Sequence, residues 1–356
     1  MTAPARRRPV ISAWTAISPF GYGREAFAGG VRSRREPALE PGGPGDPAAV
    51  VPGFDVRELF GRKKTRAMNR VSGLTVAAAQ QLLADMKLAP EGDREHIGFV
   101  LGTTTGSAQS MMDLTRASIT GEQPDHVEPA AVPGTVMNCA AGQAAIWHGL
   151  KGPNATIAAG RTTGLQALNY ARRLLMTGRA AQVLCGAAEE NSDARSWMEH
   201  HRRGGPATLG EGCAMFLLEP ADSADPRSVL ATLTGIDSRI CLDGDLAGTL
   251  HALVSSLLNR SGIGAERVWA AVGSRFPTGW PEDATLRRLF GDEVTDRVPP
   301  VDLIGDTSAA TSLFGLASVL SLADGADRGE QDHIVVTACD DDGSVAGALL
   351  RLGGER

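Results

Sequence analysis

The chain has 356 residues, of which 42% are hydrophobic and 21% charged, a composition typical of a globular protein with room for one large or two fused α/β units. A formal net charge of −6 argues against a general nucleic-acid surface. Five cysteines without a CxxC pair are typical of buried thiols in a reducing compartment, so we expect a cytoplasmic protein. No apolar run is long enough for a membrane span, no spacing fits a metal site, and no motif calls for a cofactor.

Apolar periodicity along the chain predicts alternating strands and helices. The predicted strands are 10–17, 96–104, 156–159, 181–188, 208–219, 229–237, 267–274, 301–305, 333–339 and 345–352. The predicted helices are 68–88, 137–150, 162–177, 246–259 and 308–322. Three polar or Gly/Pro-containing stretches are predicted as surface loops: 29–54, 105–135 (with one helical turn at 110–114) and 191–206.

The stretch from Ala155 to Gly178 reads as a buried strand, a sharp turn at Gly160 and a helix. A strand that enters a helix through a tight turn is where many α/β enzymes hold a nucleophile. The residue at this turn is Arg161, which is neither a nucleophile nor a base at neutral pH. The segment therefore has the layout of an enzyme without its reactive residue.

The order strand, turn, helix, strand, strand occurs twice, in 155–219 and in 301–352. This repeat predicts a duplicated α/β architecture with two similar halves, 1–220 and 225–356. The two strand-to-helix turns, at Arg161 and Asp306, are expected to face each other across the pseudo-twofold axis.

Five motifs lie in order between residues 17 and 219, and together they resemble β-ketoacyl synthases of the thiolase superfamily, a similarity that covers nearly the whole chain. They are Ile17-Ser-Pro-Phe-Gly-Tyr-Gly23, Gly152-Pro-Asn-Ala-Thr-Ile157, Gly164-Leu-Gln-Ala-Leu168, Gly186-Ala-Ala-Glu189 and Leu209-Gly-Glu-Gly-Cys-Ala-Met-Phe-Leu-Leu-Glu219. The resemblance implies a thiolase fold, with duplicated β-α-β-α-β-α-β-β halves in a layered αβαβα arrangement.

The catalytic positions implied by the resemblance are all occupied by other residues. The family's Cys falls on Arg161, its first His on Phe276 and its second His on Asp306. A Claisen condensation needs a thiolate to carry the acyl chain and His donors to hold the developing negative charge. The resemblance therefore implies a non-catalytic chain length factor that pairs with an active ketosynthase in a bacterial type II polyketide, possibly polyene, synthase.

Such a subunit would form an obligate heterodimer and shape the tunnel for an acyl chain carried on the 4'-phosphopantetheine arm of acyl carrier protein. By position in the family, Met111, Met112 and Met137 are expected to reach the partner's tunnel as gates. The strand residues Thr156, Ile157, Ala158 and Ala159 are expected at the subunit interface. Two alternatives stay open: an acyltransferase or decarboxylase with a relocated active residue, such as a cysteine, and a docking module for acyl carrier protein.

Arg161 itself has two interpretations. It either forms a buried ion pair with Asp306, with Phe276 closing the third wall, or it binds the anionic group of a ligand. We predict the ion pair, because a cation at one turn and a carboxylate at the facing turn is what joint replacement of a catalytic pair would produce.

Overall fold

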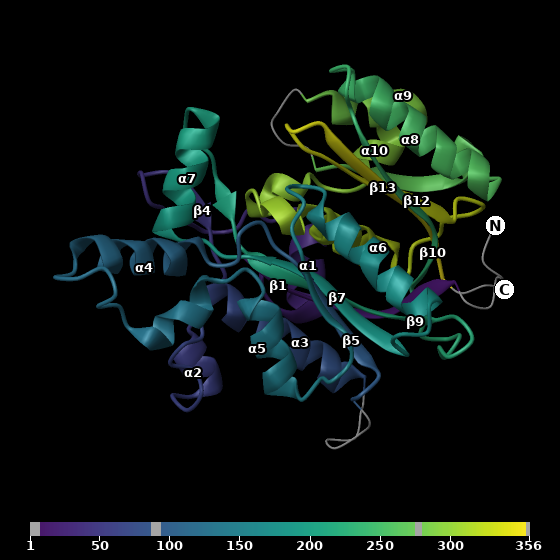
Figure 1. Cartoon of the computed structure of the whole chain (residues 1–356). Helices are drawn as coiled ribbons and strands as arrows, with labels where there is room; N and C mark the ends of the chain where they lie inside the picture. The colour runs from purple at the N-terminus through teal and green to yellow at the C-terminus, as the bar shows by residue number, and fades with distance from the viewer. Residues whose placement is uncertain (1–7, 87–93, 275–279, 354–356) are drawn as a thin grey trace.

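The computed structural model describes residues 8–86, 94–274 and 280–353. Their main strands follow one continuous path in the order β11-β12-β13-β10-β1-β9-β7-β5-β6 (Figure 1). The strands on this path are β1 (Pro9–Ser18), β5 (Ile97–Gly102), β6 (Asn154–Ile157), β7 (Gln182–Glu189), β9 (Gly212–Pro220), β10 (Ala231–Ile240), β11 (Val268–Val272), β12 (His333–Cys339) and β13 (Ser344–Leu352). Short strands lie beside it: β2 (Gly21–Tyr22), β3 (Leu39–Pro41), β4 (Pro47–Ala49) and β8 (Leu209–Gly210).

The sheet is narrow where its two parts meet. Strand β1 pairs with β9 along most of its length, but with β10 only at Val10–Thr232 and Ile11–Ala231. On one side of this seam the order is β1-β9-β7-β5-β6, and on the other it is β10-β13-β12-β11. Among the described residues, β10, β13, β12 and β11 repeat the order of β1, β9, β7 and β5, and no counterpart of β6 follows β11. Division of the chain into halves near residue 220 nevertheless stays a prediction.

The helices form layers around the two parts of the sheet (Figure 1). Between them lie α6 (Thr163–Met176) and α11 (Thr311–Ala323), in one shared core with α1 (Gly23–Arg32). Helices α3 (Arg70–Asp85) and α5 (Cys139–His148) cover the outer face of one part, and α8 (Leu246–Ser261) and α9 (Pro281–Phe290) cover the other. This arrangement confirms the predicted thiolase fold. Every residue of α11 except Leu322 is buried, which explains why this helix is apolar on all sides.

The predicted strand over 301–305 is wrong. Val301–Ile304 is the 3-10 helix η4, in which Leu303 N donates to Pro300 O at 3.1 Å and Gly305 N donates to Asp302 O at 2.8 Å. Pro299 and Pro300 come directly before it, and proline has no N–H to donate to a neighbouring strand. The repeat in the sequence therefore overstates the symmetry of the structure at this point.

Each of the three predicted loops contains regular structure. The stretch 29–54 begins inside α1 and holds β3 and β4, 105–135 holds α4 (Ala108–Thr120) and the 3-10 helix η2 (Pro129–Thr135), and 191–206 holds α7 (Asp193–Arg203). The remaining elements are α2 (Val56–Phe60), α10 (Asp292–Asp296), η3 (Ala265–Arg267) and η5 (Ser308–Ala310). None of the helices within the described ranges is long and apolar enough to cross a bilayer.

Candidate functional site: a buried arginine–aspartate centre

The tight turn after β6 places Arg161 in the interior. The strand ends at Ile157, two residues earlier than predicted, and Ala158 and Ala159 lead into the turn. Gly160 has φ +53°, and a Cβ at this position would overlap the carboxylate of Asp340. That carboxylate accepts a hydrogen bond from Arg161 N at 2.7 Å. Glycine at 160 is therefore required both by the backbone angle and by the close approach of Asp340.

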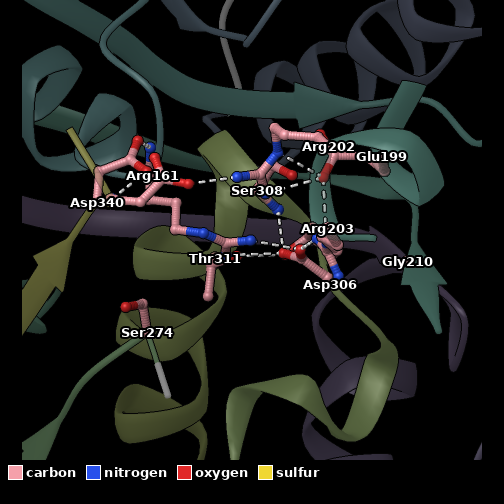
Figure 2. Close-up of polar contacts among 12 residues, drawn as sticks. Arg161, Glu199, Arg202, Arg203, Gly210, Ser274, Asp306, Ser308, Thr311 and Asp340 are labelled. Carbon is pink, nitrogen blue, oxygen red and sulfur yellow. Dashed lines mark hydrogen bonds and ion pairs between the residues drawn. The ribbon is translucent and has the colours of Figure 1, made fainter. Parts of the chain in front are cut away.

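The side chain of Arg161 forms a bidentate ion pair with Asp306 (Figure 2). The distances are 2.9 Å from Nη1 to Oδ1 and 2.5 Å from Nη2 to Oδ2, and the two side chains are only 6% and 1% exposed. The predicted buried pair is thus confirmed. Burial alone would raise the pKa of Asp306, but the charges of Arg161, Arg203 and Arg195 outweigh it and hold this pKa well below its usual value.

Two further arginines, both from α7, converge on Asp306. Arg203 Nη2 contacts the carboxylate, and Arg195 Nη2 donates to the backbone oxygen at 2.9 Å. Ser308 N donates to Oδ1 at 2.9 Å, and Gly210 N also donates to the backbone oxygen. The sequence reasoning missed both arginines because it assigned 191–206 to a loop. Their spacing with Glu199, at i, i+4 and i+8, is the helical signal that points to them.

A cavity of about 670 Å³ lies beside this centre. Most of its described lining residues are charged. They are Arg161, Arg202, Arg203, Gly205, Pro206, Ala207, Thr208, Trp280, Asp302, Asp306, Asp340 and Asp341. No cysteine or histidine occurs among these lining residues. Phe276, predicted as the third wall, lies outside the described residues.

The predicted gate methionines lie away from this cavity. Met111 and Met112 are exposed on α4, and Met137 is exposed just before α5. Helix α7 packs beside α4 and adds two exposed apolar residues that the sequence analysis did not single out, Trp197 and Met198. Of the predicted interface residues, Thr156 and Ile157 lie on β6, which pairs with β5 at the end of the described sheet, and Ala158 and Ala159 follow it.

Four of the five thiols, those of Cys139, Cys185, Cys213 and Cys339, have pKa values raised by burial, which is unfavourable for nucleophilic chemistry. Cys185 and Cys213 are completely buried in strands β7 and β9, and burial raises the pKa of each thiol. Burial also raises the pKa of Cys139 on α5. A nucleophilic cysteine reacts as the thiolate, which a raised pKa disfavours. No group of His, Cys, Asp or Glu with the arrangement of a metal site occurs among the described residues.

Comparison with known proteins matches residues 45–224 to the family description "Beta-ketoacyl synthase, N-terminal domain". This chain belongs to the β-ketoacyl synthase family. It is 26% identical to 3-oxoacyl-[acyl-carrier-protein] synthase 2 of Vibrio cholerae over 319 residues, 78% of this chain and 75% of that protein. The corresponding synthase of Vibrio harveyi is also 26% identical, over 323 residues.

A solved structure described as the ishigamide ketosynthase/chain length factor superposes on this chain with a TM-score of 0.91. Identity is 40%, and the match covers 98% of this chain and 100% of the other. A β-ketoacyl synthase from Burkholderia phymatum shares the fold, with a TM-score of 0.80 at 17% identity over 97% and 99% of the two chains. The β-ketoacyl synthase family is therefore confirmed, while the match of Arg161, Phe276 and Asp306 to the catalytic positions stays a prediction.

Proposed function

We propose that this chain is a non-catalytic, chain length factor subunit that pairs with an active ketosynthase in a type II polyketide synthase. The observation that carries the proposal is the bidentate pair between Arg161 and Asp306 at the strand-to-helix turn. An arginine that is permanently protonated can neither attack a thioester nor take up a proton. A carboxylate held by two guanidinium groups is likewise a poor proton donor.

The similarity to the ishigamide ketosynthase/chain length factor supports pairing with a ketosynthase, because 40% identity extends over nearly the whole chain. The surface supports it as well. Large apolar side chains are exposed on successive contacting elements α7, α4, η2 and α5; they are Trp197, Met198, Met111, Met112, Ile119, Val132, Val136, Met137 and Ile146. We call this the apolar face. Exposed apolar surface of this extent is typical of protein interfaces.

One alternative is that the chain is itself an enzyme, an acyltransferase or decarboxylase whose reactive residue lies at another position. The pKa values of Cys139, Cys185 and Cys213 are all raised by burial, which disfavours the thiolate needed for acyl transfer.

The other alternative is a docking module for acyl carrier protein, which needs no tunnel for the acyl chain. A type II polyketide synthase ketosynthase has been solved with its acyl-carrier protein, and at 19% identity it shares the fold of this chain. We propose acyl carrier protein as a partner of the assembled heterodimer.

The proposal is tested by co-expressing this chain with a ketosynthase, encoded beside it, that retains its Cys and both His. We expect one heterodimer in size-exclusion chromatography and elongated acyl chains on carrier protein by mass spectrometry. Products should disappear when the partner's cysteine is replaced and persist for Cys139→Ala in this chain. Condensation or decarboxylation by the purified chain alone would overturn the proposal.

A further inference from the structure

One face of helix α7 carries buried or half-buried charged side chains, whereas its large apolar side chains are exposed. Arg195, Glu199 and Arg203 lie at i, i+4 and i+8 along one face, and this face points toward the protein interior. Trp197 and Met198 on the other face are 49% and 46% exposed, and the Trp197 ring stacks on His201. A surface helix ordinarily has the opposite pattern, with the apolar stripe facing the core.

The buried face of α7 is held by hydrogen bonds and ion pairs that centre on Asp306. Arg195, near the start of the helix, donates to Asp306 O, to Glu190 O and to Gly210 O at 2.8–2.9 Å. Arg203, the last residue of the helix, contacts the Asp306 carboxylate. Glu199 lies between them and accepts from Arg203 Nε at 3.0 Å. Arg195 and Arg203, which lie toward opposite ends of α7, thus both contact Asp306, and Figure 2 shows the contact of Arg203.

We propose that Asp306 is a positioning residue for α7, and that it fixes where Trp197 and Met198 stand on the apolar face. The Arg161–Asp306 pair then has a second role besides filling the turn after β6. Arg161 holds the carboxylate in place through Nη1 and Nη2. Oδ2, which accepts from Arg161 Nη2, also contacts Arg203 Nη2. That the apolar face meets a ketosynthase rests on the proposed function, whereas the attachment of α7 to Asp306 does not.

At Arg203 the attachment is an ion pair with the Asp306 carboxylate, whereas Arg195 donates to backbone oxygens. The Asp306 side chain is 1% exposed and that of Arg203 is 10% exposed, so solvent screens their interaction weakly. The neighbouring Arg202 provides a natural contrast. It pairs with Glu199 and Asp341, but it is 42% exposed and Asp341 is 62% exposed, so this contact contributes little to stability. Arg202 is therefore a matched control on the same helical turn.

The test is hydrogen exchange of the backbone amides in the full chain, read by mass spectrometry over residues 193–203. In Arg203→Gln we expect amides of α7 to exchange at least about tenfold faster, while peptides from α8 and β12 keep their rates. Asp306→Asn should also make α7 exchange faster, but because it lowers the stability of the whole fold, peptides from α8 and β12 should exchange faster too. Arg202→Gln should leave α7 within about twofold of the unmodified chain. If Asp306→Asn does not fold, Arg203→Gln alone decides the result, since Arg203 lies at the rim of the site.

The conservative variant Arg203→Lys separates charge from packing, because it keeps the positive charge. It should exchange more slowly than Arg203→Gln. Equal rates for these two variants, unchanged protection of α7 in Arg203→Gln, or an equal loss of protection in Arg202→Gln would each overturn the proposal. Because exchange is measured without a ketosynthase, failure of the heterodimer to form would contradict the proposed function and leave this result standing.

Discussion

At the scale of single residues, the groups that meet at Asp306 keep their charges at neutral pH. The arginines stay protonated, and the carboxylate of Asp306 stays ionised. Its depressed pKa means that the folded state binds the proton less readily than the unfolded chain. The stability that the carboxylate contributes is therefore fully present above the unfolded pKa, near 3.8, and is lost as the pH falls through the lower folded value. We expect the Arg161–Asp306 pair to persist throughout the mildly acidic and neutral range.

Removing the charge of Asp306 should destabilise the protein strongly. In Asp306→Asn, the guanidinium groups of Arg161 and Arg203 lose their buried counter-charge, and breaking a buried pair in this way costs roughly 3–5 kcal/mol. Urea unfolding at pH 7 measures this loss of unfolding free energy. Asp225→Asn, the same change in an exposed pair with Arg227, is the control and should have little effect. Equal stability of the two variants would contradict the expectation.

Glu189 should make stability depend on pH in the opposite direction. Burial raises its pKa from 4.5 to about 7, although the charge of Arg195 and hydrogen bonds from Thr104 N and Oγ1 lower it and Glu190 raises it. The folded state then binds more protons than the unfolded chain between these two values, so the contribution of Glu189 to stability falls as the pH rises from about 4.5 to 7.

Glu189→Gln should remove this dependence, because an amide fits the same two contacts with Thr104 and does not titrate. Unfolding free energies measured from pH 5 to pH 8 should decrease less for the variant than for the unmodified chain. The difference cannot exceed about 3 kcal/mol, since one pKa unit corresponds to about 1.4 kcal/mol. Parallel pH profiles for the two proteins would show that Glu189 does not titrate in this range.

At the scale of elements, the sequence predicts the buried strands and the long helices, because their apolar residues recur with a clear period. Strand 333–339 and the helices near 162–177 and 246–259 match β12, α6 and α8 closely. Helix α7 escapes this reasoning for a physical reason. The charged Arg195 is buried, whereas the large apolar Trp197 and Met198 are exposed together with Asp193, His201 and Arg202, so polarity does not indicate which side of this helix is buried.

The same contrast applies to the site. The pair of Arg161 and Asp306 was predictable because the internal repeat and the family resemblance put both residues at equivalent turns. Arg195 and Arg203 were not, because neither the repeat nor the resemblance involves them, and their i, i+4, i+8 spacing with Glu199 indicates a helix but not its contact with Asp306. Val301–Ile304 shows the limit of the repeat itself, since the two prolines before it override the apolar pattern.

Helix α4 should influence the length of the product. Met111 and Met112 are exposed beside α7, and Met137 lies near the start of α5. If the apolar face lines the partner's tunnel, replacing each methionine by alanine removes bulk from the tunnel wall, and we expect products longer by two-carbon units. Mass spectrometry of the carrier-bound chains from the reconstituted pair measures the shift.

Ile240 is the control for the gate residues. It is 59% exposed at the end of β10, outside the apolar face. Ile240→Ala should leave the chain length unchanged. Identical products from all three methionine variants would remove these residues from the gate.

At the scale of the whole molecule, the apolar face should make the isolated chain prone to self-association. Ile146 on α5 is 84% exposed, and comparable side chains continue over α4 and α7. Without a partner, this surface is covered most readily by another copy or by aggregation. Light scattering of the purified chain at micromolar concentration should therefore show species larger than a monomer, and co-purification with the ketosynthase should give a single heterodimer. A monodisperse monomer would contradict this expectation, and Ile146→Glu should weaken the heterodimer.

The unequal ends of the sheet limit how many chains can join through strand pairing. At one end, the outer edge of β6 faces no other strand in the described chain. At the other end, α10 packs against β11 where a further strand is missing, and Arg297 Nη1 donates to Trp269 O at 2.8 Å. If only one edge strand of a sheet is free to pair with a strand of another copy, two copies can join in a closed dimer, but further copies cannot add to form a filament. The cover that α10 and Arg297 provide for β11 thus makes assembly by this route self-limiting.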